Sequence, residues 1–549
     1  MRWRISRSLV IIGLVVAVCV PLGIAGHQEL SGASASASVT SSRAVPTPVP
    51  TAAWTKLLAL STDLGPAKTR SIDVMVTLKS GNRPVELEKW ARARDLRLTW
   101  YSDERFAVLS GAPAEIGSAF GIRIDSYRSR TGLHFYSAVR QPGVPKALSS
   151  EVTGIGRISD YGQPTTAFQP RDFVPDGGLT PAGLLQAYQA TPLAQRGFQG
   201  QGETVVFIEY TPLSLTDLKD FSQKFGLPPF DVQVVGGIPA TPQSELGEAD
   251  MDIETVHEIA PKAKLVYYNL TKAPGITNSS DFAVAIALSI AAASKEFPGA
   301  IMSMSLQDCE SNAGSVEIQG MSSAAASAES TGSTLFASSG DAGGADCGSF
   351  SADSLTSAKG VNIPAVAPNI TGTGGTTLSV AANGAYLGET TWSSPMLSQG
   401  SGGGVSTFVA RPSWQVGVGV GAGGVPDMRE VPDVSAEADP VTGNAIIISG
   451  TLQAGGGTSL SSPVWAGLTT LMDEFLKASG APPIGFANPL FYRLANEKSL
   501  SPSPFHDVTV GGNDFYRAGP SYDPVTGVGT PDVAALAEDI LAATKTGHS

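Results

Sequence analysis

The stretch G-E-A-D-M-D-I-E-T-V-H-E-I-A-P-K-A-K-L-V-Y-Y-N, Gly247 to Asn269, contains one complete unit of the fold. Its first half carries apolar residues at helical spacing, and Lys264–Asn269 is an apolar run of strand length. The same alternation continues in both directions along the chain. We expect strands also at Thr204–Glu209, Asp231–Val235, Ala300–Ser305 and Thr334–Ser339, and helices at Leu215–Phe225, Glu245–Ile259, Asp281–Glu296 and Val316–Glu329. Regular alternation of this kind predicts an α/β fold in which helices cover both faces of a parallel sheet.

Residues 70–162 show a different order of elements. The patterns predict strands at Ser71–Leu78, Leu96–Tyr101, Phe106–Gly111 and Ile122–Tyr127, and helices at Pro84–Arg94 and Pro113–Phe120. This order is the split βαβ pattern of a ferredoxin-like α+β unit. A low-complexity spacer, 38–69, precedes this unit, and a linker rich in proline and glycine, 163–178, follows it. We expect 179–549 to be a second folded unit and the linker to be the part of the chain most open to cleavage.

The N-terminus has the features of an export signal. Arg2, Arg4 and Arg7 precede the apolar run Leu9–Ile24, and small residues follow that run. We therefore expect 1–37 to be a secretory signal peptide and the rest of the chain to be extracellular. The alternative is an uncleaved membrane anchor, which would also place the rest of the chain outside the cell.

Composition and cysteine content narrow the possible partners. The chain has 549 residues and a net charge of −13, and no basic cluster beyond the N-terminus is dense enough to follow a phosphate backbone. We therefore expect no nucleic-acid partner, and we expect a monomer. An oxidising compartment favours a disulfide between Cys309 and Cys347. Two buried free thiols are the alternative, and two cysteines without matching histidines make a poor metal site.

The acidic helix that begins the quoted stretch has two different sides. On a projection of about 100° per residue, Glu248 and Asp252 fall in the middle of its apolar side, whereas Asp250, Glu254 and His257 fall on the opposite side. We expect these last three to form a solvated face. Two stacked carboxyls on a core-facing side are costly unless they share a proton or bond to a partner. Sharing raises one apparent pKa, which suits a general base that works in acid.

Two glycine-rich segments each place one polar residue beside a regular element. In A-G-G-G-T-S-L-S-S-P-V-W-A-G, Ala454 to Gly467, Ser459 lies where a glycine turn meets the start of a helix. Free backbone N–H groups at such a position can stabilise an oxyanion, although helix capping is an equally good local role for Ser459. In F-A-S-S-G-D-A-G-G, Phe336 to Gly344, Asp341 follows a strand, and its alternative role is an Asx-turn.

Taken together, these segments resemble the sedolisin family of serine-carboxyl peptidases in its pro-kumamolisin-type layout. The acidic helix resembles the E-x-x-x-D segment of that family, and G-T-S at 457–459 resembles its nucleophile motif. S-S-G-D-A-G at 338–343 resembles its oxyanion-aspartate loop, and V-P-D-V-S-A-E-A-D-P-V-T-G, Val431 to Gly443, is similar to its most recognisable stretch. The resemblance covers Arg70 to Asp532.

The resemblance implies a subtilisin-like sheet and a serine peptidase that cleaves protein or peptide substrates in acid. Glu248 should take the proton of Ser459, Asp252 should orient Glu248, and Asp341 should complete the oxyanion hole. A carboxyl donates a hydrogen bond to an oxyanion only while it is protonated, so Asp341 implies activity below neutrality. Residues 70–162 should be a propeptide that assists folding, inhibits its own catalytic unit and is removed by cleavage in the linker.

The resemblance also implies one bound Ca²⁺ ion. Asp507 and Asp523 match the carboxylate ligands of the family site, and the carbonyl groups of Val508, Gly519 and Ser521 match its other ligands. Oxygen ligands of this kind suit Ca²⁺. From local sequence alone, both aspartates would be turn residues, and Ser521 stands where relatives usually have glycine.

One departure from the family pattern follows the strand at Ala300–Ser305. Relatives typically have a Trp-Gly pair there, whereas this chain has Leu306 and Gln307. Glu209 matches an acid that bonds to that tryptophan in some relatives. The departure therefore affects the outer hydrogen bonds around the carboxyl pair and the neighbouring subsite.

Other classes of peptidase, and a protein without activity, are the alternatives to this function. A subtilisin-type triad needs a histidine near Ser459, but His257 projects away from the carboxyl pair and His506 adjoins the calcium segment. A metallopeptidase is excluded because no H-E-x-x-H occurs. A secreted binding protein that has lost activity is a hypothesis of a different class, and the intact catalytic set argues against it. The sequence does not separate endopeptidase from tripeptidyl-type exopeptidase action.

Overall fold

The computed structural model describes residues 51–130, 132–162, 178–229, 231–240, 247–277, 281–347, 359–394 and 399–545. The predicted signal peptide and residues 163–177 of the predicted linker lie outside these ranges. The two described parts, 51–162 and 178–545, belong to one compact unit. No helix in these parts is both long enough and apolar enough to cross a membrane.

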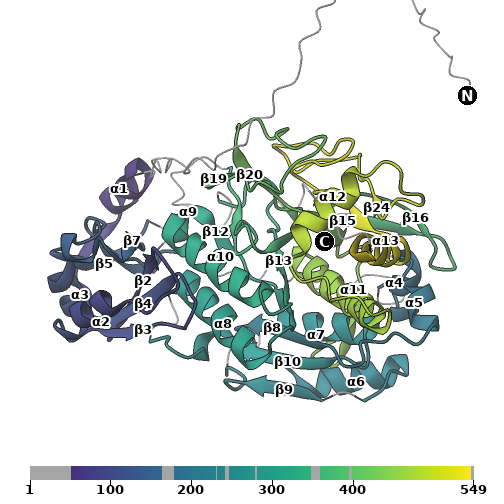
Figure 1. Cartoon of the computed structure of the whole chain (residues 1–549), viewed down its shortest axis with the longest axis horizontal. Coiled ribbons are helices and arrows are strands. Elements are labelled where there is room, and N and C mark those ends of the chain that lie inside the picture. The colour runs from purple at the N-terminus through teal and green to yellow at the C-terminus, as the bar shows by residue number, and fades with distance from the viewer. Residues whose placement is uncertain are drawn as a thin grey trace, which may run out of the picture. The chain divides into compact units, whose positions relative to one another are not determined.

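A sheet of eight strands organises residues 178–545 (Figure 1). Its order is β16-β15-β13-β11-β8-β10-β9, and β21 pairs with β15 beside this path. The strands are β8 (Thr204–Glu209), β9 (Val232–Val235), β10 (Lys264–Asn269), β11 (Ile301–Met304), β13 (Thr334–Ser338), β15 (Thr371–Val380), β16 (Tyr386–Thr391) and β21 (Val434–Glu437). Every pairing is parallel except that of β15 with β16. The predicted parallel α/β fold is therefore confirmed.

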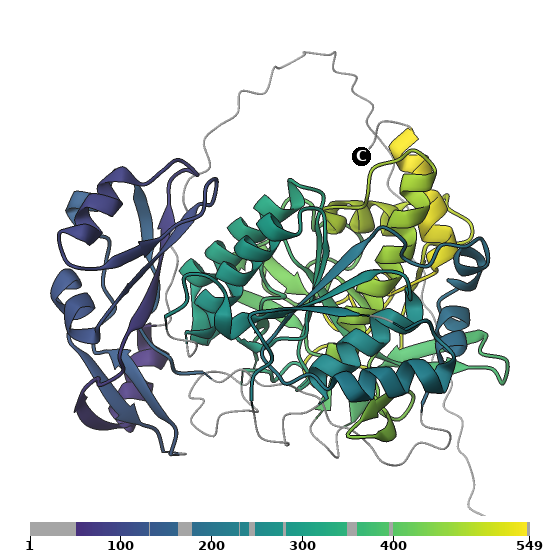
Figure 2. The same cartoon turned by 90° about the horizontal axis from the view of Figure 1, so that it is seen from below.

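Side chains of the sheet alternate between two hydrophobic cores. Val205 and Phe207 of β8 belong to one core, and Val206 and Ile208 belong to the other. Helices cover both faces (Figures 1 and 2). The first core contains residues of α7 (Glu248–Ile259) and α11 (Thr458–Ala478), and the second contains residues of α8 (Phe282–Glu296) and α10 (Ser315–Glu329). Helix α7, which is buried throughout, and α11 thus lie on one face of the sheet.

The N-terminal part begins earlier than the sequence predicts and differs in one strand. Helix α1 (Thr51–Leu60) and strand β1 (Thr62–Pro66) already form within the predicted spacer. A four-stranded antiparallel sheet has the order β3-β4-β2-β7, with β2 (Ile72–Leu78), β3 (Arg97–Thr99), β4 (Phe106–Gly111) and β7 (Val152–Ile155). The predicted helices are present as α2 (Val85–Arg92) and α3 (Pro113–Phe120).

The fourth predicted strand forms, but it does not join this sheet. Strand β5 (Ile124–Arg128) pairs with β1 and with β6 (His134–Ala138) in a separate three-stranded sheet. Its partner β6 follows after a short loop, and closing a short loop costs little entropy. Strand β7 therefore takes the place beside β2 that the ferredoxin-like pattern assigns to β5.

The N-terminal sheet packs against helices α8 and α10. Met75, Phe106 and Val108 join the hydrophobic core that these helices share with the large sheet. The backbone N–H of Asp73 donates to Asp281 at the start of α8, at 2.7 Å. The two parts of the chain therefore share both apolar and polar buried contacts.

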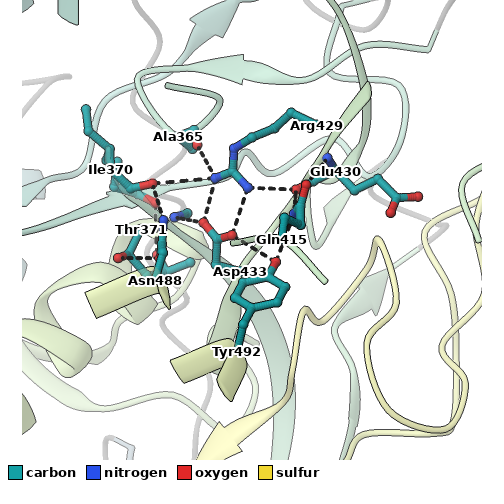
Figure 3. A network of polar contacts seen from close by, with 12 residues as sticks. Ala365, Ile370, Thr371, Gln415, Arg429, Glu430, Asp433, Asn488 and Tyr492 are labelled. Atoms are coloured by element: carbon teal, nitrogen blue, oxygen red, sulfur yellow. Dashed lines mark hydrogen bonds and ion pairs between the residues drawn. The ribbon is translucent and has the colours of Figure 1, made fainter. Parts of the chain in front are cut away.

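A buried ion pair fixes β21 beside β15 (Figure 3). Arg429 donates to both carboxyl oxygens of Asp433, at 2.8 and 2.6 Å, and both side chains are fully buried. Gly372 of β15 and Tyr492 also donate to Asp433, at 2.8 and 3.0 Å. Burial acts to lower the pKa of the Arg429 guanidinium, but the charge of Asp433 outweighs it and raises that pKa. The network keeps in place the strand on which α11 packs.

Candidate active site

Helices α7 and α11 lie in contact with their N-termini at the same end. A Cβ atom at Gly455, just before α11, would lie 2.9 Å from Sδ of Met251, and one at Gly467 would lie 2.9 Å from Cδ1 of Ile259. The two helices therefore approach closely and run in the same direction. Glu248 is the first residue of α7 and Ser459 is the second residue of α11, so both lie at this end.

The turn before α11 places Asp341 next to Ser459. Gly457 has a φ of +90°, and a Cβ atom there would lie 2.5 Å from Oδ2 of Asp341. Glycine alone combines this backbone conformation with this close approach. The backbone N–H and the hydroxyl of Thr458 then donate to Oδ1 of Asp341, each at 2.7 Å. The aspartate is thus bound to the residue that precedes the candidate nucleophile.

The second carboxyl oxygen of Asp341 is available for a ligand. Oδ2 is buried and has no hydrogen-bond partner among the residues that the structure describes. Burial raises the pKa of Asp341 to about 7, while the hydrogen bonds from Thr458 act to lower it. Below this pH the carboxyl is protonated and can donate a hydrogen bond from Oδ2.

Three buried carboxyls form a cluster near the start of α11. Glu248, Asp252 and Glu209 are 1%, 0% and 0% exposed. A hydrogen bond joins Glu209 to Asp252, which requires a proton between the two carboxyls. Burial raises the pKa of Glu209 to about 7. Burial also raises the pKa of Asp252 well above its ordinary value, and the charges of Glu209 and Glu248 raise it further. Burial and these neighbouring charges thus both favour the protonated form of Asp252.

Ser305 connects these carboxyls to the backbone of the nucleophile. Its Oγ lies 2.9 and 2.8 Å from the two carboxyl oxygens of Asp252, and 3.0 Å from the carbonyl oxygen of Ser459. A protonated Asp252 can donate to this hydroxyl, which then donates to the carbonyl. Sequence reasoning misses Ser305, because a serine at a strand end carries no local sign of function. It also places Glu209 only in an outer position, whereas Glu209 bonds to Asp252 directly.

The opposite side of α7 is buried, so the prediction of a solvated face is wrong. Asp250, Glu254 and His257 are each 0% exposed. Oδ1 of Asp250 accepts from the backbone N–H of Ser214, and Oε2 of Glu254 accepts from that of Ile447, both at 2.8 Å. Segments far away in the sequence pack on this side of the helix, and their backbone N–H groups donate to its carboxyls. A helical projection does not show which segments pack on a helix.

The two histidines that the structure describes after the linker are engaged elsewhere. Nε2 of His257 lies 2.9 Å from the carbonyl oxygen of Pro228, and burial lowers the pKa of His257 to about 4. Nε2 of His506 lies 2.9 Å from Oε1 of Gln189, and its ring stacks on Tyr386. Neither histidine serves as a base for Ser459, so the geometry does not favour a subtilisin-type triad.

The loop that carries Asp341 is tied down at its far end. The predicted disulfide between Cys309 and Cys347 is present. Oδ1 of the neighbouring Asp346 accepts from the backbone N–H of Ala342 at 2.8 Å. These bonds connect the loop that carries Asp341 to the segment that follows Ser305.

The residues expected to bind calcium converge on one turn. The backbone N–H of Ser521 donates to Asp507 at 2.8 Å, and that of Gly519 donates to Asp523 at 3.0 Å. Ser521 has a φ of +67°, a conformation that glycine adopts readily. Within the described ranges, no three His, Cys, Asp or Glu side chains gather into a metal site. Two carboxylates together with carbonyl oxygens are a donor set of the kind that Ca²⁺ prefers.

The sequence and the fold of this chain are similar to those of known proteins. No family model matches the chain. The chain is 30% identical to kumamolisin from Bacillus sp. (strain MN-32) over 489 residues, which cover 83% of this chain and 82% of kumamolisin. It is 36% identical to tripeptidyl-peptidase 1 from Macaca fascicularis over 159 residues, 26% of this chain and 27% of that protein. The solved structure of Pseudomonas sedolisin, a serine-carboxyl proteinase in complex with two molecules of pseudo-iodotyrostatin, matches with a TM-score of 0.56 and 28% identity over 68% of this chain and 99% of that chain.

Proposed function

This chain belongs to the sedolisin family of serine-type peptidases, and we propose that it is an acid-active endopeptidase with Ser459 as nucleophile and Glu248 as base. One observation carries the proposal. The Asp341 carboxyl is bound to Thr458, next to Ser459, with a buried oxygen that has no other partner in the described residues. Such an oxygen donates to an oxyanion in acid and loses this ability above neutrality.

Acylation begins with transfer of the Ser459 hydroxyl proton to Glu248. We assign the negative charge of the carboxyl pair to Glu248, because burial and neighbouring charges raise the pKa of Asp252 well above its ordinary value and so favour its protonated form. The serine oxygen bonds to the carbonyl carbon of the substrate, and Asp341 donates a hydrogen bond to the resulting oxyanion. Glu248 then returns the proton to the leaving amine as the peptide bond breaks.

Deacylation repeats these steps with water as the nucleophile. Glu248 takes a proton from water, the hydroxyl oxygen attacks the acyl-enzyme, and Asp341 again donates to the oxyanion. The proton returns to Ser459 as the ester bond breaks. Asp252, held by Glu209 and Ser305, orients Glu248 throughout.

We further propose that the chain is made as a secreted, self-processing precursor. Residues 70–162 would act as an intramolecular inhibitor, and cleavage within 163–178 would release a monomeric catalytic unit from about residue 179. Support comes from the buried contacts between the N-terminal sheet and helices α8 and α10. Further support is the position of Gly162, where a Cβ atom would lie 2.6 Å from the Asp308 carboxyl, close to the strand end that carries Ser305.

Asp507 and Asp523 would hold one Ca²⁺ ion, together with the carbonyl groups of Val508, Gly519 and Ser521. Ca²⁺ would neutralise the two carboxylates and hold the segments that carry them together. Adding a calcium chelator should lower the melting temperature of the Ser459→Ala protein, and excess Ca²⁺ should restore it. The assignment fails if the double variant Asp507→Asn/Asp523→Asn responds to chelation as strongly as the parent.

Incubation of the purified precursor at about pH 4 tests the proposed function, because this pH keeps Asp341 protonated. The wild type should shorten itself and then cleave a fluorogenic peptide, whereas Ser459→Ala should remain full length. Equal behaviour of the two proteins would instead identify a binding protein that has lost activity. Release of N-terminal tripeptides as the main product would identify a tripeptidyl-type exopeptidase.

A further inference from the structure

The side chains of Ser303 and Ser305 face α11. The hydroxyl of Ser303 lies 2.9 Å from that of Ser462, and the hydroxyl of Ser305 lies 3.0 Å from the carbonyl oxygen of Ser459. Met302, Met304 and Leu306 belong to the core on the other face of the sheet. The segment therefore keeps strand alternation as far as Leu306.

Gln307 is the next residue on the side that faces α11. Gln307 forms a β-bridge directly before the short strand β12 (Asp308–Cys309). Continued alternation from Ser303 and Ser305 predicts that its side chain lies on the same side as theirs. Two strand residues advance about 7 Å. Because Ser303 faces Ser462 and Ser305 faces Ser459, this advance carries Gln307 past the start of α11. That space lies beside the nucleophile and the loop that carries Asp341.

The carboxamide of Gln307 is buried. The residue is 3% exposed, and neither Nε2 nor Oε1 has a hydrogen-bond partner among the described residues. Leaving a buried amide unpaired costs free energy, so such groups are normally bonded. Gln415 illustrates the normal case, because Nε2 donates to Glu430 and Tyr492 while Oε1 accepts from Glu430. A ligand that pairs with Gln307 would remove the cost at this position.

We propose that Gln307 is a specificity-determining residue whose carboxamide pairs with a substrate side chain next to the cleaved bond. The preferred side chain has a donor and an acceptor, as a carboxamide or an un-ionised carboxyl does. This inference rests on the proposed peptidase function. A substrate with an apolar side chain at that position leaves Gln307 unpaired, and unpaired buried groups discriminate strongly between substrates. Because a carboxamide does not titrate, Gln307 keeps this role throughout the acid range.

Profiling of a peptide library at about pH 4 tests the proposal with wild type, Gln307→Met and Gln415→Met. Methionine has nearly the size of glutamine but offers no comparable donor or acceptor. At one position flanking the cut, the wild type should prefer Gln, Asn or Glu over Met or Leu by at least about tenfold in kcat/KM. Gln307→Met should lose this preference or reverse it. The control Gln415→Met should keep the wild-type profile.

The outcome separates this inference from the proposed function. Cleavage of peptides by wild type but not by Ser459→Ala would support the peptidase function. The inference about Gln307 is wrong if, in the same experiment, Gln307→Met keeps the wild-type profile or if its kcat/KM falls by the same factor for every peptide. If Gln307→Met does not fold, Gln307→Glu provides the test. At about pH 3 its carboxyl is protonated and offers a donor and an acceptor, as the carboxamide does, so the preference should be preserved. Loss of the preference in this variant at that pH overturns the proposal.

Discussion

At the scale of single residues, the chemistry depends on where protons reside among buried carboxyls. Asp341 must hold a proton to stabilise an oxyanion, and burial raises its pKa to about 7. The contribution to catalysis that we propose for Asp341 should therefore be present below this pH and lost as the pH rises through about 7. Burial and the charges of Glu209 and Glu248 also raise the pKa of Asp252 well above its ordinary value, which agrees with the proposal that Glu248 is the base.

Asp341→Ala should lower kcat by about 10² to 10³ and change KM little, because the lost hydrogen bond forms mainly in the transition state. The measurement is steady-state hydrolysis of one peptide in acid. Asp473→Ala is the control. Asp473 is also buried with a pKa of about 7, but it accepts a hydrogen bond from Ile484 in a different region. An equal loss in both variants would remove Asp341 from the mechanism.

Ser305→Ala should lower kcat by about tenfold with little change in KM, the effect of losing one buried hydrogen bond of about 1.4 kcal/mol. Ser305 touches Asp252 and the backbone of Ser459, so its removal disturbs their alignment and not substrate binding. Ser303→Ala is a matched control, because it removes a buried hydroxyl one step earlier on the same side of the strand. A similar kcat for the two variants would mean that Ser305 acts only through stability.

At the scale of elements, the turn before α11 requires a glycine at position 457. The turn must bring Thr458 against Asp341, and this leaves no room for a Cβ atom at Gly457. The parallel packing of α7 and α11 then places Glu248 and Ser459 at the same end of the helix pair. Neither helix produces this arrangement alone, because the contacts at Gly455 and Gly467 set their relative position.

Gly457→Ala should abolish activity, because the new methyl group would displace the Asp341 carboxyl. Gly450→Ala provides the comparison, since Gly450 also has a positive φ, of +73°, but has open space around its Cβ position. Both substitutions should destabilise the fold by about 1–3 kcal/mol through backbone strain. Urea unfolding and peptide hydrolysis together separate the two effects. An active Gly457→Ala protein would contradict the proposed contact.

At the scale of the whole molecule, the many buried carboxyls should make the free energy of unfolding larger in acid than at neutral pH. Burial raises the pKa of Asp250 to about 7 and raises those of Glu254 and Glu258 well above their ordinary values. Between the pKa of the unfolded chain and the higher pKa of the folded chain, the folded state binds more protons. The free energy of unfolding therefore falls as the pH rises through this window, by about 1.4 kcal/mol per pH unit for each such group.

The Ser459→Ala protein should accordingly melt at a higher temperature at about pH 4 than at about pH 8. This variant is chosen because it cannot digest itself. Glu254→Gln should reduce the pH dependence, since glutamine can still accept from Ile447 but does not ionise. Melting temperatures measured across this range provide the check. A melting temperature that increases with pH would show that the buried carboxyls do not dominate stability.

The sequence by itself determined the parallel α/β class and the candidate catalytic residues. Periodicity predicted β8, α6 (Leu215–Phe225) and β10 with the bounds that the structure has. This succeeded because these elements bury regular apolar faces, and such faces are visible in a local window. The buried positions of Glu248 and Asp252 were predicted for the same reason.

Only the tertiary structure decided which groups meet. The burial of Asp250 and Glu254, the pairing of β5 outside the four-stranded sheet and the link from Ser305 to Asp252 all depend on segments far apart in the sequence. That the carboxamide of Gln307 has no hydrogen-bond partner among the described residues is likewise visible only in three dimensions. The physical reason is that hydrogen bonds and desolvation depend on distances of a few ångströms in space, whereas periodicity describes only which side of an element a residue occupies.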